Sequence, residues 1–289
     1  MKNLLIHPNE GASVYQRITA SDAGWEHLNM EARLLKKGES WTGYTGEDEY
    51  GFILLSGNYT VATNHGTWTT SNGRKSVFSG IAHSLYLPRH TEFKLTATSE
   101  VLDIAAGWVK AKADFPARFK TPEEAAIEIR GGENATRQIN SLIEPGFGCS
   151  SLVAVEVYTP SGNWSSFPAH KHDVRLLDAN GELKEADLEE IYFYKIDKAG
   201  GFALQQVYTS DRSLDEILRA GNNDAVLVPE GYHPVVALHG YNCYYLNFLA
   251  GSDQSLANTP DPEHNWIFDS WKFRDPRIPM VTAEMNNQP

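Results

Sequence analysis

The sequence predicts an all-β protein of two tandem β-barrels, or jelly rolls, with a few short helices. Both halves are series of short runs rich in β-branched and aromatic residues, each ended by turn residues, which is typical of a sandwich or barrel. The composition changes between residues 110 and 134, where Gly131-Gly132 interrupts the chain. Two patterns of the first half also recur weakly in the second, as a duplicated barrel would explain.

In the first half, strands are expected at residues 49–55, 59–62, 84–87 and 93–97. The last of these alternates apolar and polar residues, as a half-buried strand does. Thr121-Pro122 followed by two acids is a helix-start signature. We therefore expect a first domain over residues 1–128 and a second over residues 129–289.

In the second half, strands are expected at residues 152–158, 189–195, 203–208, 225–228 and 244–249, with an inserted hairpin at Leu177–Gly181. Ser213 and Glu216 have the spacing of a capping box, and Gly221 supplies a stop. This combination predicts one short helix between them.

The repeated patterns set Glu49-Tyr-Gly-Phe beside Glu190-Ile-Tyr-Phe, and Leu85-Tyr-Leu-Pro beside Val226-Leu-Val-Pro. The first copy has no His-x-His upstream of Glu49. We therefore expect only the second barrel to hold a metal ion.

The charge argues against nucleic acid as a partner, because 37 Asp and Glu outweigh 25 Lys and Arg and give a net charge of -12. No apolar stretch is long enough to span a membrane, and the run at Met1–Ile6 is too short for a signal peptide. A cytoplasmic protein is expected. Pairing at sheet edges would allow a homo-oligomer.

Candidate metal ligands lie in the second half. His170 and His172 are one residue apart in an extended segment, so both imidazoles would project from one face. One of the acids Glu189 and Glu190, together with His233, would supply two more ligands, and such a set suits Zn, Mn, Fe, Co or Ni. Because Glu189 and Glu190 alternate across the strand, only one of them faces inward. The alternative is that the histidines are hydrogen-bonded or exposed loop residues.

These motifs resemble those of the cupins, metal-binding β-barrel proteins. More closely, the runs Thr159–Ser166, His170–Asp173, Leu188–Tyr194, Val207–Glu216 and Val228–Val235 resemble the 5-deoxy-glucuronate isomerases of myo-inositol catabolism, which are bicupins of this length. The resemblance implies conversion of 5-deoxy-D-glucuronate, a sugar acid, to 5-dehydro-2-deoxy-D-gluconate with a divalent metal, for which Zn is our expectation. Among pectin-pathway isomerases the metal-binding Glu stands two residues before a Tyr-Phe-Tyr run, which selects Glu190.

Candidate catalytic residues follow from that chemistry. A general base must reach C2 of the sugar, and Glu156, Tyr192, Tyr194 and a metal-bound hydroxide are the candidates. Arg212 is a candidate partner for the substrate carboxylate, because guanidinium binds carboxylate bidentately. A salt bridge from Arg212 to a neighbouring Asp is the competing interpretation.

Three other functions stay open at this stage. The first is isomerisation of a related keto-deoxyuronate. The second is an Fe(II) dioxygenase in the same three-His, one-Glu site, which would require O2. The third is a sugar-acid sensor, although the chain has no helix-turn-helix pattern to read DNA.

Overall fold

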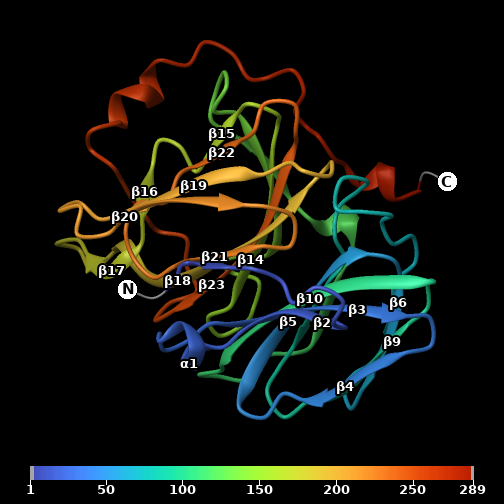
Figure 1. Cartoon of the computed structure of the whole chain (residues 1–289). Coiled ribbons are helices and arrows are strands. Elements are labelled where there is room, and N and C mark those ends of the chain that lie inside the picture. Colours follow the sequence, from blue (N-terminus) through green and yellow to red (C-terminus); the bar gives the residue numbers. More distant parts are fainter. Residues whose placement is uncertain (1–2, 288–289) are drawn as a thin grey trace.

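Two β-barrels lie side by side in the computed structural model, which describes residues 3–287 (Figure 1). Each barrel pairs one large sheet with a smaller one, and the helices are short. This architecture confirms the predicted all-β class with two barrels.

The first barrel contains a six-stranded and a four-stranded sheet. In sheet order, the larger has β11 (Arg118–Lys120), β8 (Ser84–Leu87), β5 (Asp48–Ser56), β10 (Val101–Lys110), β3 (Asn29–Lys36) and β2 (Val14–Ile18). The smaller has β4 (Ser40–Tyr44), β9 (Glu92–Ala97), β6 (Tyr59–Thr63) and β7 (Gly66–Thr69). Neighbouring strands are antiparallel throughout.

The second barrel is built in the same way. Its larger sheet has β1 (Leu5–Ile6), β21 (Ala225–Val228), β18 (Leu183–Ile196), β23 (Cys243–Gly251), β14 (Val153–Thr159), β13 (Arg137–Ile143) and β12 (Ile127–Arg130), with β17 (Asp173–Leu177) also paired to β18. The smaller has β15 (Trp164–Ser165), β22 (Val235–Ala237), β19 (Ala203–Tyr208) and β20 (Asp215–Ala220). A further pair joins β16 (His170–Lys171) to β24 (Thr259–Pro260). The expected boundary at residue 128 lies inside β12.

The helices are α1 (Ala20–Ala23) and three 3-10 turns, η1 (Pro122–Glu124), η2 (Asn265–Asp269) and η3 (Ala283–Asn287). The helix-start signature at Thr121 is present, but it opens only the single turn η1. The helix predicted after Ser213 is wrong. Ser213 lies in a turn stabilised by Asp211, and the chain continues as strand β20, which pairs with β19.

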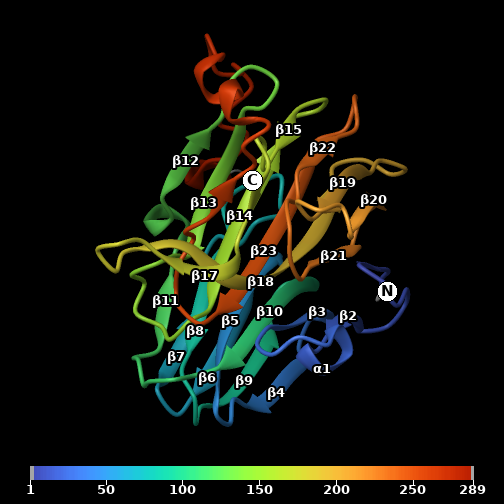
Figure 2. The ribbon, with the colours of Figure 1, turned by 90° about the vertical axis from the view of Figure 1, so that its left-hand side faces the viewer.

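The two large sheets pack face to face, as the turned view shows (Figure 2), and one apolar cluster runs through both. Gly51 of β5 and Gly107 of β10 are paired across the first sheet. A Cβ at Gly107 would approach the ring of Phe248 to 2.4 Å, and one at Gly51 would approach Ile143 to 2.6 Å. The absence of side chains at this glycine pair lets the sheets approach closely.

The interiors of the two barrels differ. The first is filled by apolar side chains, among them Phe52, Leu54 and Ile104. The second presents Glu190 and Tyr192, with other polar residues, to a cavity. The filled barrel therefore serves as a support, and the second barrel has room for a ligand.

Matching carboxylates connect each barrel to the other. The Glu49 carboxylate accepts hydrogen bonds from the backbone N–H groups of residues 150–152, just before β14, at 2.6–2.8 Å. The Glu189 carboxylate does the same for residues 26–28, just before β3, at 2.5–2.9 Å. Glu49 and Glu189 therefore occupy equivalent positions in the two barrels, as a duplication would produce.

This correspondence changes the register of the repeat. Glu49 corresponds to Glu189, so Tyr50 corresponds to Glu190, and the sequence comparison that set Glu49 beside Glu190 is out of register by one residue. Strand pairing agrees, because Tyr50 and Glu190 each lie opposite the residue that precedes a proline. In the first barrel, an aromatic ring thus occupies the place of the acid.

Both ends of the described chain reach the opposite barrel (Figure 1). The first strand, β1, pairs with β21 of the second barrel. Near the other end, Asn286 of η3 accepts a hydrogen bond from Ile81 N at 2.9 Å and donates one to Ile81 O at 3.0 Å, in the first barrel. The barrels therefore share strands and loops as well as an apolar interface.

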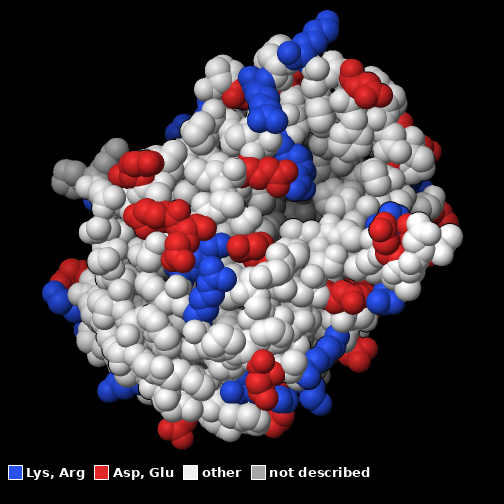
Figure 3. Space-filling view, turned by 180° about the vertical axis from the view of Figure 1, so that it is seen from behind, with Lys and Arg blue, Asp and Glu red and all other residues white. Residues whose placement is uncertain are grey.

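On the face seen in Figure 3, Lys and Arg are interspersed with Asp and Glu and form no continuous basic surface. No helix within residues 3–287 is long and apolar enough to cross a membrane.

Candidate metal centre and cavity

The four predicted ligands lie together at one wall of the second barrel. Nε2 of His172 lies 2.9 Å from Oε2 of Glu190, and Nε2 of His233 lies 3.3 Å from the same oxygen. Ligand atoms of these three residues are all within 4.8 Å of one another. The ring of His170 is centred 4.9 Å from that of His233. Three imidazoles and one carboxylate are thus gathered from three separate segments.

Backbone contacts hold two of the imidazoles with Nε2 directed to the cluster. His172 Nδ1 lies 3.2 Å from the carbonyl oxygen of Leu188, and His233 Nδ1 lies 2.8 Å from that of Gly231. Gly231 has φ 86°, and a Cβ there would meet the Tyr208 carbonyl oxygen at 2.4 Å. A glycine is therefore required where the chain turns toward His233.

The acid Asp173 links the two ligand motifs. Its Oδ2 accepts a hydrogen bond from Gly231 N at 2.9 Å, and its other oxygen pairs with Lys171 at 2.5 Å. Lys171 also pairs with the buried Glu185 at 2.7 Å. Such outer contacts fix the orientation of ligands, as they do around metal sites in general.

The pKa shifts of His170 and His233 favour metal binding, whereas that of His172 reflects its contact with Glu190. Burial and the neighbouring His233 lower the pKa of His170 well below its usual value. Burial lowers the pKa of His233 to about 4, despite the charge of Glu190. Burial alone would lower the pKa of His172 too, but its hydrogen bond to Glu190 and the charge of that residue outweigh burial and raise it. Neutral imidazole is the form that binds metal.

The residues fit a divalent ion. Nε2 of His233 is buried without a hydrogen-bond partner, which is costly unless another group satisfies it. A divalent ion held by Glu190 and the neighbouring imidazoles would do so. Three neutral nitrogens with one carboxylate leave the site net positive and suit a borderline metal.

The cavity beside this cluster has a volume of about 300 Å³. Strands β12, β13, β14, β18 and β23 form its walls, with apolar side chains such as Val155 and Leu249. Polar groups face it from Tyr192, Ser166 and Asn247. A concave, mixed surface of this size is typical of a small-molecule site.

Of the two inward-facing tyrosines, Tyr192 lines the cavity and Tyr194 is turned to another partner. Tyr192 Oη lies 3.2 Å from Ser166 Oγ, whereas Tyr194 donates a hydrogen bond to Gln205 at 2.8 Å. Burial, together with the Glu190 charge, raises the pKa of Tyr192 well above its usual value. Tyr192 therefore holds its proton at neutral pH.

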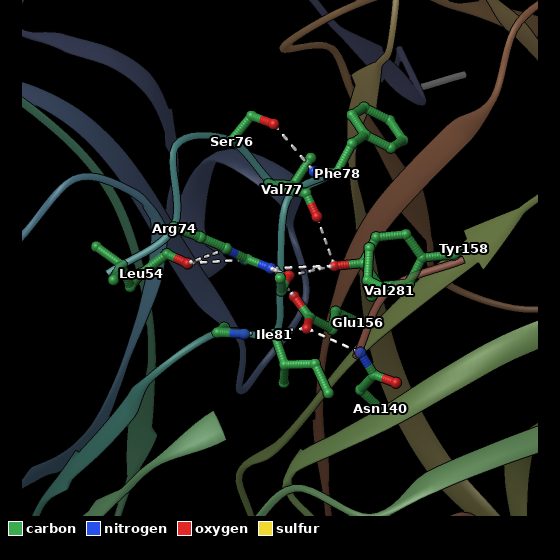
Figure 4. A network of polar contacts seen from close by, with 12 residues as sticks. Leu54, Arg74, Ser76, Val77, Phe78, Ile81, Asn140, Glu156, Tyr158 and Val281 are labelled. Atoms are coloured by element: carbon green, nitrogen blue, oxygen red, sulfur yellow. Dashed lines mark hydrogen bonds and ion pairs between the residues drawn. The ribbon is translucent and has the colours of Figure 1, made fainter. Parts of the chain in front are cut away.

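The structure places Glu156 outside the cavity. Val155 and Val157 on either side of it face the cavity, so Glu156 points from β14 toward the first barrel. Its carboxylate is fully buried and pairs with the fully buried Arg74 at 2.8 Å (Figure 4). It also accepts hydrogen bonds from Asn140 and Ala82 N. A group tied in this way does not face a substrate in the cavity, and Glu156 is accordingly not retained as a base.

Arg212 also lies away from the metal cluster. It sits in the turn before β20 with φ 58°, is 44% exposed at its side chain, and pairs with Asp215 at 3.1 Å. Its guanidinium stacks 4.1 Å above the ring of Tyr208. The salt bridge considered as the competing interpretation is the one that forms, and Arg212 is not among the residues that line the cavity.

Sequence reasoning did not select several residues that face the cavity, chiefly Arg137, Asn247 and Tyr245. A detectable signal existed for Arg137, because it is a lone cation at the start of the run Arg137-Gln-Ile-Asn-Ser-Leu-Ile. Tyr245 and Asn247 alternate with apolar residues in an otherwise buried strand.

Comparison with known proteins places these features in context. The model of the KduI/IolB family matches residues 4–267. A Geobacillus thermodenitrificans protein named 5-deoxy-glucuronate isomerase is 39% identical over 264 residues, which are 91% of this chain and 94% of that protein. A Bacillus subtilis protein of the same name is 34% identical over 263 residues, 90% of this chain and 95% of that protein.

Solved structures also resemble this chain, to different degrees. The crystal structure of an IolB-like protein from Salmonella typhimurium matches with a TM-score of 0.87 and 38% identity, over 92% of this chain and 99% of the other. Oxalate decarboxylase of Bacillus subtilis matches with a TM-score of 0.62 and 11% identity, over 90% of this chain and 80% of the other. The second likeness shows only a shared all-β fold.

Proposed function

We propose that this chain, which belongs to the KduI/IolB family, is an aldose-ketose isomerase that converts 5-deoxy-D-glucuronate to 5-dehydro-2-deoxy-D-gluconate. The observation that carries the proposal is the cluster of three imidazoles and one carboxylate at the wall of a cavity of mixed polarity. The names of the curated relatives agree with it.

The residues that would hold a divalent metal ion are His170, His172, Glu190 and His233. When bound, the ion supplies Lewis-acid polarisation to the carbonyl and neighbouring hydroxyl oxygens of the sugar. We propose Zn as the ion, while Mn, Fe, Co and Ni suit the same donors.

The side chains of the protein must orient the sugar and transfer its protons. Moving the carbonyl from C1 to C2 removes the proton on C2 and delivers one to C1. We assign Tyr192 as a hydrogen-bond donor to a substrate oxygen, since its hydroxyl faces the cavity, keeps its proton and is oriented by Ser166. Apolar walls at Val155 and Leu249 restrict water around the enediolate, which strengthens these electrostatic contacts.

The test is anaerobic turnover of 5-deoxy-D-glucuronate followed by NMR, with protein that has been stripped by a chelator and then supplied with Zn, Mn or Fe. We expect no conversion by the stripped protein and conversion to the 2-deoxy-5-keto acid after one metal is added back. The Glu190→Gln variant is the matched negative control, and Tyr192→Phe should lower kcat with its metal content unchanged.

The alternatives predict other outcomes of the same assay. Turnover of only a related keto-deoxyuronate would identify a neighbouring isomerase. Turnover only with iron and O2 would identify a dioxygenase and refute the proposal. The cytoplasmic location and the homo-oligomer expected from the sequence stay predictions.

A further inference from the structure

Arg137 presents a buried guanidinium to the cavity with almost nothing to satisfy it. The residue is 5% exposed and lines the cavity from the start of β13. Its one hydrogen bond in the described structure runs from Nη1 to the Phe167 carbonyl oxygen, at a long 3.5 Å. Burial lowers the pKa of Arg137, and the charge of the nearby Glu128, which is itself held by Arg130, offsets only part of that effect. Guanidinium has five N–H donors, so most of them are left for a ligand.

The contrast with Arg74 shows how this protein satisfies a structural arginine. Arg74 is also buried, yet its guanidinium donates to two backbone carbonyl groups, to Tyr158 and to Glu156. Burial alone would lower its pKa, but the Glu156 charge outweighs burial and raises it. A buried arginine without such partners is strongly destabilising, so Arg137 is expected to serve a ligand.

Its neighbour Arg130 does not offer the same opportunity. Arg130 lies opposite Arg137 in the β12–β13 pair and also lines the cavity. Its side chain is 46% exposed, and its guanidinium donates two hydrogen bonds to the Glu128 carboxylate, at 2.9 and 2.7 Å. Arg137 is therefore the cavity cation whose donors are free.

A second unsatisfied donor lies in the same cavity. Asn247 of β23 is 3% exposed, lines the cavity, and its Nδ2 is buried without a hydrogen-bond partner. A buried amide donor without an acceptor, beside a buried guanidinium with a single long hydrogen bond, points to a ligand rich in acceptor oxygens. Guanidinium pairs bidentately with carboxylate, which a neutral sugar lacks.

We infer that Arg137 binds the carboxylate of the sugar acid and so determines which end of the substrate reaches the metal ligands. The inference rests on the proposed function and deepens it, because it names the residue that binds the acid group of the substrate. With the carboxylate at Arg137, the C1–C2 end is directed to the cluster around Glu190. Asn247 donates to the same ligand. Arg137 takes the role that sequence reasoning gave to Arg212.

The experiment compares Arg137→Gln and Arg137→Lys with the unchanged protein on two substrates, 5-deoxy-D-glucuronate and the neutral 5-deoxy-D-glucose. We expect Arg137→Gln to lower kcat/KM for the acid by about 10²–10³-fold and to leave kcat/KM for the neutral sugar unchanged. Arg137→Lys keeps the charge but loses the bidentate geometry, so its kcat/KM for the acid should lie between those of Arg137→Gln and the unchanged protein. Arg212→Gln is the matched control and should behave as the unchanged protein.

Two further readouts separate this inference from the proposed function. Metal content must be equal in all variants, and binding of D-glucuronate and D-glucose is measured by calorimetry with metal-free and Zn-loaded protein. If the unchanged protein isomerises neither substrate, the proposed function fails, but the inference survives if D-glucuronate binds and Arg137→Gln abolishes its binding. Equal losses on the acid and the neutral sugar, an unaltered Arg137→Gln variant, or no binding of D-glucuronate to the unchanged protein would overturn it.

Discussion

The adjacent acids Glu189 and Glu190 allow a sharp test of the site, because conservative substitutions of the two should have opposite consequences. Both belong to β18, and their side chains point to opposite faces of the sheet. Glu190 contacts the imidazoles of His172 and His233. Glu189 holds backbone N–H groups of residues 26–28 in the first barrel. We therefore compare Glu190→Gln with Glu189→Gln.

Glu190→Gln removes the single anion of the predicted ligand set. Loss of an outer contact to a metal ligand commonly lowers affinity by about 10–100-fold, so loss of a ligand charge should lower it by at least about 100-fold. The metal-free protein should keep its stability, because the amide oxygen can still accept a hydrogen bond from His172. Bound metal and turnover should disappear together.

Glu189→Gln should have the reverse effect. The carboxylate accepts three backbone hydrogen bonds, and the amide keeps only one acceptor oxygen and no charge. At least one charge-assisted hydrogen bond is lost, each contributing about 1.5–3 kcal/mol. We expect the free energy of unfolding to fall by roughly that amount while metal content stays unchanged.

Elemental analysis after dialysis and urea unfolding of the metal-free proteins measure both quantities. Equal loss of metal from the two variants, or loss from Glu189→Gln alone, would refute the assignment of Glu190. An unaltered unfolding midpoint for Glu189→Gln would refute the stabilising role of its contacts.

Three further predictions follow from buried and exposed charges. Glu156→Gln should destabilise the protein by about 3–5 kcal/mol, because it leaves Arg74 buried without its anion. Turnover by the folded fraction should persist, and a loss of turnover at unchanged stability would restore Glu156 as a catalytic candidate. Burial lowers the pKa of His83 to about 4, so on acidification the imidazole is protonated in the unfolded state before it is protonated in the folded state, and the free energy of unfolding falls as the pH drops from 6.5 toward 4. His83→Phe should remove up to about 3 kcal/mol of that fall, measured by urea unfolding at several pH values. Parallel curves of unfolding free energy against pH for the variant and the unchanged protein would contradict this prediction. Arg212→Ala should change stability by less than about 1 kcal/mol, because its ion pair with Asp215 is exposed, and a raised KM would show that it reaches substrate after all.

Local patterns predicted most of the strands, and the four candidate ligands lie together as expected, although metal binding by them stays a prediction. Runs such as those that become β5, β14 and β23 carry their own β-branched and aromatic signal. The spacing of His170 and His172 fixes their common face. The strand β20 was missed because Ser213 and Glu216 match a capping box, whereas the alternating burial of residues 215–220 is satisfied only once β19 lies beside them.

The errors at the site have a different physical origin. Period-two alternation shows that Glu156 and Val155 face opposite ways, but it does not say which face of β14 borders the cavity and which borders the other barrel. That choice depends on how the two large sheets pack. The burial of Arg137 likewise depends on β12 and β13 folding over the cavity. Its place as a lone cation in its run marks it in the sequence, but that pattern does not show that it is buried or that it faces the cavity.

The anchoring of each chain end in the opposite barrel limits how this protein can be dissected. Expressing either half alone would remove β1 from the second sheet or the Asn286 contact from the loop at Ile81. That loop lies shortly after Arg74 in the chain, so removal of the residues after 280 should weaken the ion pair between Arg74 and Glu156. A chain cut once in the exposed segment at residues 112–114 should remain a non-covalent pair of fragments under native conditions, and neither fragment should be recoverable alone in folded form.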